Sequence, residues 1–346
     1  MLARLIRRSA ALLALTASCS LAGCANDPST MLRVPANGPM PSASDERNGV
    51  LAVQELLADG TYETTLRRVD GAATTTLTPP IPDGHAGRIW GVAWRDGQAL
   101  VGDLDGHLYR YTGGDAWETL STSDCDPSTP DAWLVDAPAI DDAWLLAVGN
   151  GGGSTLCHFD GTHVDARETL GFFAQEVVEH DGTLYAMDPD AGVVRRRALT
   201  AGSTWESVRG VEEGTTQISE IVVRDDGVYA HFESYDVSTW WSVSGRTATA
   251  IEGMPGLTGE RWRLDQTTTT STHCGSSWFD GHEVCTDNVD TLDLHVMRVD
   301  GGQEREAGYL HVEQPGTRWY EAYPVGDGRL LLGSSSGEMY VTPGGL

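Results

Sequence analysis

The sequence offers few groups of residues whose types and spacing could do chemistry. The pentapeptide at 333–337, Gly-Ser-Ser-Ser-Gly, matches the nucleophile-elbow pattern of serine hydrolases. That pattern exposes its serine only at a sharp turn from a strand into a helix, whereas here it joins two segments that both have strand character. We therefore interpret it as a hairpin turn, and the sequence assigns no catalytic residue.

Acidic residues are the next candidates, because calcium takes about six to eight oxygen ligands and many come from loop carboxylates. The best set consists of Asp287, Asn288, Asp290 and Asp293. No EF-hand loop is present, since the full Asp and Asn spacing and the closing Glu are missing. Asp and Asn are also common turn formers. The sequence thus predicts no cofactor, and calcium at these four residues is the one candidate kept open.

Six cysteines are present, and four of them follow residue 48. An even number of cysteines in an oxidising compartment makes disulfides the default. Four cysteines allow three pairings, and loop closure favours near neighbours. The predicted disulfides are therefore Cys125–Cys157 and Cys274–Cys285. Histidines flank the second pair, but their spacing does not match a zinc module.

The N-terminus has the pattern of a secretory signal, with three arginines and no acid before an apolar run at 9–18. The run is too short for a transmembrane helix, which needs ~20 apolar residues. Leu21-Ala22-Gly23-Cys24 follows and resembles the lipobox of bacterial lipoproteins. The resemblance implies removal of residues 1–23 and acylation (palmitate) of Cys24, which would hold the exported protein on a membrane. Because residue 25 is Ala and not Asp, analogy with enteric lipoproteins favours the outer membrane.

Composition divides the rest of the chain and excludes one class of partner. Residues 24–48 are rich in Pro, Ser, Asn and Ala and predict a lipidated flexible tether, with a single domain over 49–346. The formal net charge is −27, and loss of the three signal arginines would leave −30. There is no lysine. Nucleic-acid binding requires clustered cationic side chains, so we expect no nucleic-acid partner.

An internal repeat dominates the segment after residue 48. Seven Asp-containing turn signals span the 268 residues from Asp59 to Asp327, so their six steps average about 45 residues. A propeller blade takes about 40–50 residues. The signals are Asp59-Gly60, Asp96-Gly97, Asp141-Asp142, Asp181-Gly182, Asp226-Gly227, Asp280-Gly281 and Asp327-Gly328. The longest step suggests an insertion around 267–277.

Short apolar segments stand on both sides of most of these signals, for example at 89–94 and 99–102. Short strands at even spacing, with aromatic residues between them, resemble β-propellers in general and match no particular propeller family. The expected fold is therefore an all-β propeller of four-stranded blades, seven on the count of signals, with six or eight still open. Bacterial lipoproteins with propeller domains, including an outer-membrane assembly factor, share this architecture, although fold does not fix function.

Two functions of different classes fit this fold. The first is a non-catalytic binding or scaffold protein of the cell envelope, attached to the membrane by its lipid and facing an envelope protein or glycan. The second is a glycan-active hydrolase or lyase with a carboxylate or histidine site at the central channel. Charged side chains with shifted pKa values converging on the axis would favour the enzyme. An axis of small or apolar groups would favour binding.

Overall fold

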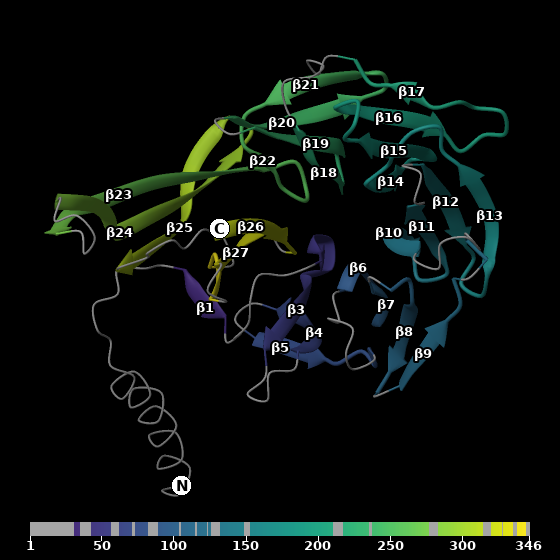
Figure 1. Ribbon diagram of the computed structural model, residues 1–346, viewed down its shortest axis with the longest axis horizontal. Coiled ribbons are helices and arrows are strands. Elements are labelled where there is room, and N and C mark those ends of the chain that lie inside the picture. Colours follow the sequence, from purple (N-terminus) through teal and green to yellow (C-terminus); the bar gives the residue numbers. More distant parts are fainter. Residues whose placement is uncertain are drawn as a thin grey trace, which may run out of the picture.

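Seven antiparallel sheets of four strands each make up the described part of the chain in the computed structural model. Figure 1 shows them arranged as blades around a central axis. The expected seven-bladed β-propeller is therefore confirmed. The structure describes residues 31–34, 43–56, 62–70, 73–81, 89–103, 105–114, 116–122, 124–125, 132–148, 153–209, 217–234, 237–276, 283–313, 320–326, 328–334 and 338–343. The predicted signal peptide, lipobox and Cys24 lie outside these ranges.

The blades follow one another in chain order. Blade 1 consists of β2 (Ala43–Asp45), β3 (Val50–Leu56), β4 (Tyr62–Asp70) and β5 (Ala73–Leu77). Blade 2 consists of β6 (Ile89–Arg95), β7 (Gln98–Asp103), β8 (Leu108–Gly113) and β9 (Ala116–Leu120). Blade 3 consists of β10 (Ala132–Ala139), β11 (Asp142–Val148), β12 (Ser154–Phe159) and β13 (Val164–Thr169).

The remaining blades follow the same order of strands. Blade 4 consists of β14 (Glu176–His180), β15 (Thr183–Asp188), β16 (Val193–Ala198) and β17 (Glu206–Ser207). Blade 5 consists of β18 (Gln217–Arg224), β19 (Gly227–Ser234), β20 (Val237–Ser244) and β21 (Thr247–Ile251). Blade 6 consists of β22 (Met254–Pro255), β23 (Arg261–Ser276), β24 (Glu283–Asp300) and β25 (Gln303–Glu313).

Blade 7 closes the ring by combining both ends of the domain. It contains β26 (Tyr320–Val325), β27 (Arg329–Ser334), β28 (Met339–Val341) and the N-terminal β1 (Leu32–Val34). β1 pairs antiparallel with β28, with Leu32 opposite Val341. Closure of this kind leaves no long sheet edge between the first and last blades.

This closure corrects the domain boundary expected at residue 49. The segment 24–48 was predicted to be a flexible tether because it is poor in large apolar residues. Its residues 32–34 and 43–45 are instead strands of the propeller, and a 3-10 helix, η1 (Glu46–Asn48), follows. Met31 is also buried, in the cluster that contains Trp262 and Leu330. Short edge strands need few apolar residues, so composition missed them.

The second strand of most blades is buried on both faces, as its continuous apolar sequence predicts; β23 of blade 6 is the exception, with Trp262 its one buried residue among those described. In β7, Leu100 packs in the cluster shared with blade 3, whereas Ala99 and Val101 pack in the cluster shared with blade 1. Alternate residues of a strand point to opposite faces, so one strand serves two interfaces. Gly91 on β6 allows the inner strands to approach, since a Cβ there would lie 2.2 Å from the carbonyl oxygen of Leu134 on β10.

The turn signals mostly mark the hairpin between the first two strands of a blade. Asp96 and Gly97 have φ of 51° and 81°, and Asp181 and Gly182 have 48° and 67°, which is the requirement of a type I′ turn. Asp59 and Asp280 fall instead between the second and third strands of their blades and lie outside the described residues. The seven signals thus predicted the number of blades correctly, although two of them do not fall between the first and second strands.

Blade 6 departs from the others in length. β23 and β24 form a long hairpin that extends outward beyond the ring in Figure 1. The insertion predicted near 267–277 is thus a continuation of two blade strands. Cys274 and Cys285 stand directly opposite each other in this hairpin. Antiparallel partners lie about 4.5–5.5 Å apart at Cα, which suits a disulfide. Their side chains lie outside the described residues, so this disulfide stays a prediction.

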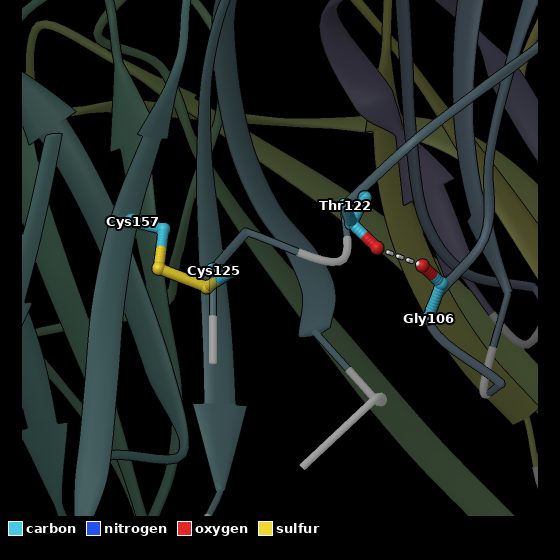
Figure 2. The surroundings of a disulfide bond; sticks show 4 residues. All are labelled: Gly106, Thr122, Cys125 and Cys157. Atoms are coloured by element: carbon cyan, nitrogen blue, oxygen red, sulfur yellow. Dashed lines mark hydrogen bonds between the residues drawn. A yellow bond between two sulfur atoms is a disulfide. The ribbon is translucent and has the colours of Figure 1, made fainter. Parts of the chain in front are cut away.

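The other predicted disulfide is confirmed. Cys125, in the connection after β9, is bonded to Cys157 on β12. Both cysteines are buried in the cluster between blades 2 and 3. Figure 2 shows that Thr122, three residues before Cys125, donates a hydrogen bond from its hydroxyl to the carbonyl oxygen of Gly106. The connection is therefore attached to blade 2 by the hydrogen bond of Thr122 and to blade 3 by the disulfide of Cys125.

Candidate functional site

A cavity of about 1410 Å³ runs along the propeller axis. The first strand of each blade contributes residues to its wall, so the cavity is built by β2, β6, β10, β14, β18, β22 and β26. Acidic side chains in the wall outnumber arginines by nine to two. A concave site of this kind is the default candidate for ligand binding in a protein of unknown function.

β-bulges reshape the cavity wall in three blades. The pairing of β6 with β7 skips Trp90, that of β10 with β11 skips Val135, and that of β18 with β19 skips Ser219. A bulge places an extra residue on the inner strand and redirects a side chain. All three extra residues line the cavity. The repeated bulge therefore shapes the axis in the same way in blades 2, 3 and 5.

Carboxylates on the inner strands accept hydrogen bonds from the main chain of a neighbouring blade. Asp45 Oδ2 accepts from the backbone N–H of Trp94 at 2.7 Å. Asp136 Oδ2 accepts from that of Glu179 at 2.6 Å. These bonds join blade 1 to blade 2 and blade 3 to blade 4. They give the carboxylates a structural role in addition to their place in the wall.

A third bond of this kind joins blades 4 and 5. Glu176 Oε2 accepts from the backbone N–H of Ile221 at 2.9 Å. The inner strands of blades 1, 3 and 4 thus each carry a carboxylate of this kind, at the end, in the middle and at the start of the strand respectively. Each such carboxylate reaches sideways to the next inner strand.

An ion pair crosses the axis near one end of the cavity. Glu46 belongs to η1 of blade 1, and Arg224 ends β18 of blade 5; Arg224 Nη2 lies 2.6 Å from Glu46 Oε2. Both side chains are nearly buried. In Figure 1 the short purple coil of η1 lies close to the axis. Burial raises the pKa of Glu46, and the attraction of Arg224 opposes that shift.

Two cavity carboxyls have pKa values close to neutral pH. Burial raises the pKa of Asp136 to about 6, against the lowering effect of the Glu179 and Ala137 backbone hydrogen bonds. Burial also raises the pKa of Glu176 to about 7, and the charges of Asp136 and Glu46 raise it further. The only opposing effect on Glu176 is the hydrogen bond from Ile221. Burial is thus the main cause of both shifts, and the nearby negative charges add to the shift of Glu176.

Aromatic side chains line the same cavity. Trp90, at the bulge of β6, is 39% exposed and packs against Trp133 with ring centroids 5.1 Å apart. On blade 5, Trp240 stacks on His231 with centroids 4.6 Å apart. Trp90 and Trp240 are both in the wall. The cavity thus combines acidic groups with flat aromatic faces.

His231 is held between two serine hydroxyls. Its Nδ1 lies 2.8 Å from Ser219 Oγ and its Nε2 lies 2.7 Å from Ser238 Oγ. Burial lowers the pKa of His231, which keeps the ring neutral at pH 7. In the part of the chain that the structure describes, no carboxylate hydrogen-bonds to this ring, so a serine–histidine–acid triad is not assembled here.

The residues singled out in the sequence lie elsewhere. Asp287, Asn288 and Asp290 are on β24 of the long hairpin, with side chains outside the described residues. Asp293, on the same strand, accepts hydrogen bonds from Tyr309 and His311, which lower its pKa. Across the described ranges, no group of three or more His, Cys, Asp or Glu is placed to hold a metal ion. The calcium site therefore stays a prediction.

Ser334, the first serine of the elbow-like pentapeptide, is buried at the end of β27. Its hydroxyl accepts a hydrogen bond from the backbone N–H of Glu338 at 2.9 Å, and β28 follows after this connection. The pentapeptide therefore joins two strands. Among the described residues, no helix is long and apolar enough to span a membrane.

Comparisons with known proteins give distant likenesses only. No family model and no curated protein matches the chain. Similar solved structures include the computationally designed Ika8 protein (TM-score 0.47, 11% identity, 91% of this chain and 99% of that one). A second is YCF48 from Cyanidioschyzon merolae, with a TM-score of 0.49 and 12% identity over 91% of this chain and 96% of that one. A third is BamB from Moraxella catarrhalis, with a TM-score of 0.44 and 14% identity over 90% of this chain and 99% of that one. The sheet topology defines the propeller fold independently of these likenesses.

Proposed function

We propose that this protein is a lipid-anchored binding protein of the bacterial envelope, and that its propeller presents the central cavity to a ligand. The observation that carries the binding function is the axial cavity itself, with its acidic and aromatic wall. The anchor rests on the lipobox-like sequence ending at Cys24. An envelope protein or a glycan is the expected partner, and the outer membrane is the favoured location.

Charged groups do converge on the axis, which is the feature that would favour an enzyme. The geometry nevertheless favours binding. Asp136 and Glu176 each bond to the main chain of the next blade, which gives their burial a structural reason. His231 has serine partners on both ring nitrogens. A nucleophile, a base and an orienting acid are therefore not brought together among the described residues.

A crosslinking experiment in intact cells tests the binding function. A photoreactive amino acid replaces Trp90 in one variant and Leu199 in the other; both residues are 39% exposed, but only Trp90 lines the cavity. We expect a defined adduct from position 90 and none from position 199. Absence of any adduct at position 90, or identical adducts at both positions, would contradict a ligand at the cavity.

The anchor is tested separately. Cells given a radioactive palmitate analogue should label the wild-type protein, and the Cys24→Ala variant should be unlabelled and released from the membrane fraction. Labelling that survives the substitution would refute lipidation at Cys24.

One observation keeps the glycan-active enzyme as a second candidate. A carboxyl that is protonated near neutral pH can act as a general acid in glycoside cleavage, and Asp136 and Glu176 meet that condition. Purified protein incubated with envelope oligosaccharides is the test. Turnover by wild type that is lost in Asp136→Asn and Glu176→Gln, but kept in Glu252→Gln, would replace the binding function by catalysis.

A further inference from the structure

We propose that the central cavity binds an organic polycation, a ligand with several ammonium or guanidinium groups along a flexible chain. The inference rests on the proposed binding function and names the chemistry of its ligand. It combines an uncompensated carboxylate in the cavity wall, carboxylates spread over several blades, and exposed aromatic faces.

Glu176 supplies the first part of the argument. Among the described residues, its carboxylate accepts a single hydrogen bond, from the backbone N–H of Ile221, and pairs with no arginine or histidine. Its neighbours Asp136 and Glu46 add negative charge. A buried carboxylate is normally paired with a cation. A positively charged group entering the cavity would supply the partner that the protein itself does not.

The arginines of the wall are already engaged elsewhere. Arg224 pairs with Glu46 at 2.6 Å and also donates to the carbonyl oxygen of Pro255. Arg95 pairs with Asp45 at 2.5 Å and donates to the carbonyl oxygens of Ala137 and Pro138. Their charges are directed to one end of the inner strands, where the first hairpins begin. The negative charge of Glu176 is therefore left for a ligand.

The distribution of the carboxylates selects an extended ligand. Asp136 belongs to blade 3, Glu176 to blade 4 and Glu233 to blade 5, so the charges extend over three adjacent blades. Within the described ranges they do not cluster tightly enough to hold a metal ion. The cavity is also larger than the ~300–1,000 Å³ that is usual for a compact ligand. Cationic groups separated by a flexible chain match this arrangement better than a single ion.

The aromatic side chains add a second kind of contact for the same ligand. A cation over the face of a Trp ring within about 6 Å of its centroid is attracted by the ring. Trp90 offers such a face because the bulge of β6 places it in the wall, half open to solvent. The alkyl segments between cationic groups would also pack on Trp90 and Trp240.

Isothermal titration of the mature chain carrying Cys24→Ala, with spermidine at low salt, tests the inference. We expect saturable binding that is weakened about tenfold by Glu176→Gln, since a hydrogen-bonded charge pair is lost. Trp90→Ala should weaken it about two- to fivefold. Glu252→Gln removes the same charge from an exposed residue outside the cavity and should leave affinity unchanged.

Two further ligands distinguish the source of the cationic groups. Triacetylated spermidine has the same chain without charge and should not bind. A short arginine-rich peptide that binds better than spermidine would assign the site to a segment of a partner protein. Absence of saturable binding by both cations, or equal weakening by Glu176→Gln and Glu252→Gln, overturns the inference. If the polycation does not bind but position 90 still forms its crosslink, the cavity binds another ligand and the proposed function stands. If no crosslink forms either, the proposed function is wrong as well.

Discussion

At the scale of single residues, Glu176 links stability to pH. Its pKa is about 7 in the folded protein against an ordinary value of 4.5, because burial and neighbouring carboxylates disfavour its charge. The folded state therefore binds more protons between these values, and the contribution of Glu176 to stability falls as pH rises from about 4.5 to about 7. Replacing Glu176 with Gln removes the charge and keeps an oxygen for the Ile221 N–H. We expect the Glu176→Gln variant to be more stable than wild type at pH 8, by on the order of 1–3 kcal/mol, and not at pH 4.5.

Thermal unfolding of both proteins across that pH range is the measurement. The Glu252→Gln variant serves as control, because Glu252 is mostly exposed. If Glu176→Gln raised Tm equally at pH 4.5 and pH 8, ionisation of Glu176 would not be the cause of the stability difference, and the prediction would be wrong.

His158 shifts stability in the same direction as Glu176, because its pKa is also raised on folding. It lies between Asp142, 2.7 Å from Nε2, and Asp165, 2.6 Å from Nδ1. Burial lowers its pKa, but the hydrogen bonds to the two carboxylates outweigh this effect and raise it above 6.5. The two ion pairs of protonated His158 therefore stabilise the fold below pH 6.5, and this contribution is lost as pH rises through the pKa of His158 in the folded protein. Its ring protons, followed by NMR, should titrate above 6.5 in wild type and lower in Asp165→Asn; an unchanged midpoint in the variant would contradict the pairing.

The candidate site could be predicted from sequence only in part. Asp136 follows the apolar segment 133–135 and Glu176 precedes the apolar pair 177–178, and an acid beside a buried segment is a signal of an unusual environment. The partners of these acids are backbone N–H groups some 43 and 45 residues further along. Only the ring geometry brings them together. Spacing within one repeat therefore cannot show which acids face the axis.

At the scale of elements, the closing strand β1 depends on Met31. Met31 is 7% exposed and packs with Trp262 and Leu330 although it precedes the first strand. Truncating a buried Met to Ala costs about 2–5 kcal/mol. We expect Met31→Ala to lower stability by about 2 kcal/mol, the lower end of that range because the neighbouring strand β1 lies at the edge of its sheet. Denaturant unfolding measures this, with Leu199→Ala as an exposed control; equal stability of both variants would show that β1 does not close the ring in solution.

The disulfide Cys125–Cys157 is the second element-scale device. It joins residues 32 apart and holds the connection between blades 2 and 3 in a buried cluster. Constraining an unfolded loop of this length stabilises the fold by about 3–4 kcal/mol. The double variant Cys125→Ala with Cys157→Ala should unfold at correspondingly lower denaturant. If reducing agent lowers the wild-type midpoint and leaves that of the variant unchanged, the effect belongs to this bond.

The strands themselves were largely predictable, and the departures have physical causes. An Asp-Gly pair suits positive φ at two successive positions, so the pairs at 96 and 181 mark their hairpins correctly. In blade 1 the first hairpin is instead a four-residue loop, 46–49, formed by η1 and capped by Gly49 at φ 62°. The bulges at Trp90, Val135 and Ser219 each shift the pairing register by one residue. A single extra residue in a short strand leaves no clear sequence signal.

At the scale of the whole molecule, repetition and closure explain why a chain with such a charge folds. In five blades the described residues of the second strand contribute to two buried clusters, and these clusters pack neighbouring blades against each other. Apolar packing between sheets supplies the stabilisation. Most acidic side chains remain on the surface or along the axis, and buried ones such as Asp103 and Asp188 are hydrogen-bonded within their blades. The negative charge is thus a property of the exposed faces, where it can act on partners at a distance.

The net charge of −27 leads to a prediction about salt. Repulsion among exposed carboxylates opposes folding, and salt shortens its range from about 30 Å at 0.01 M to about 3 Å at 1 M. Salt also weakens ion pairs such as Arg263 with Asp265 at 2.7 Å and with Glu304 at 2.8 Å. Exposed pairs contribute only about 0–1 kcal/mol each, so relief of repulsion should win. Tm should therefore rise with added NaCl and KCl alike, while affinity for spermidine falls. A Tm that drops with salt would mean that the arginine ion pairs outweigh the repulsion.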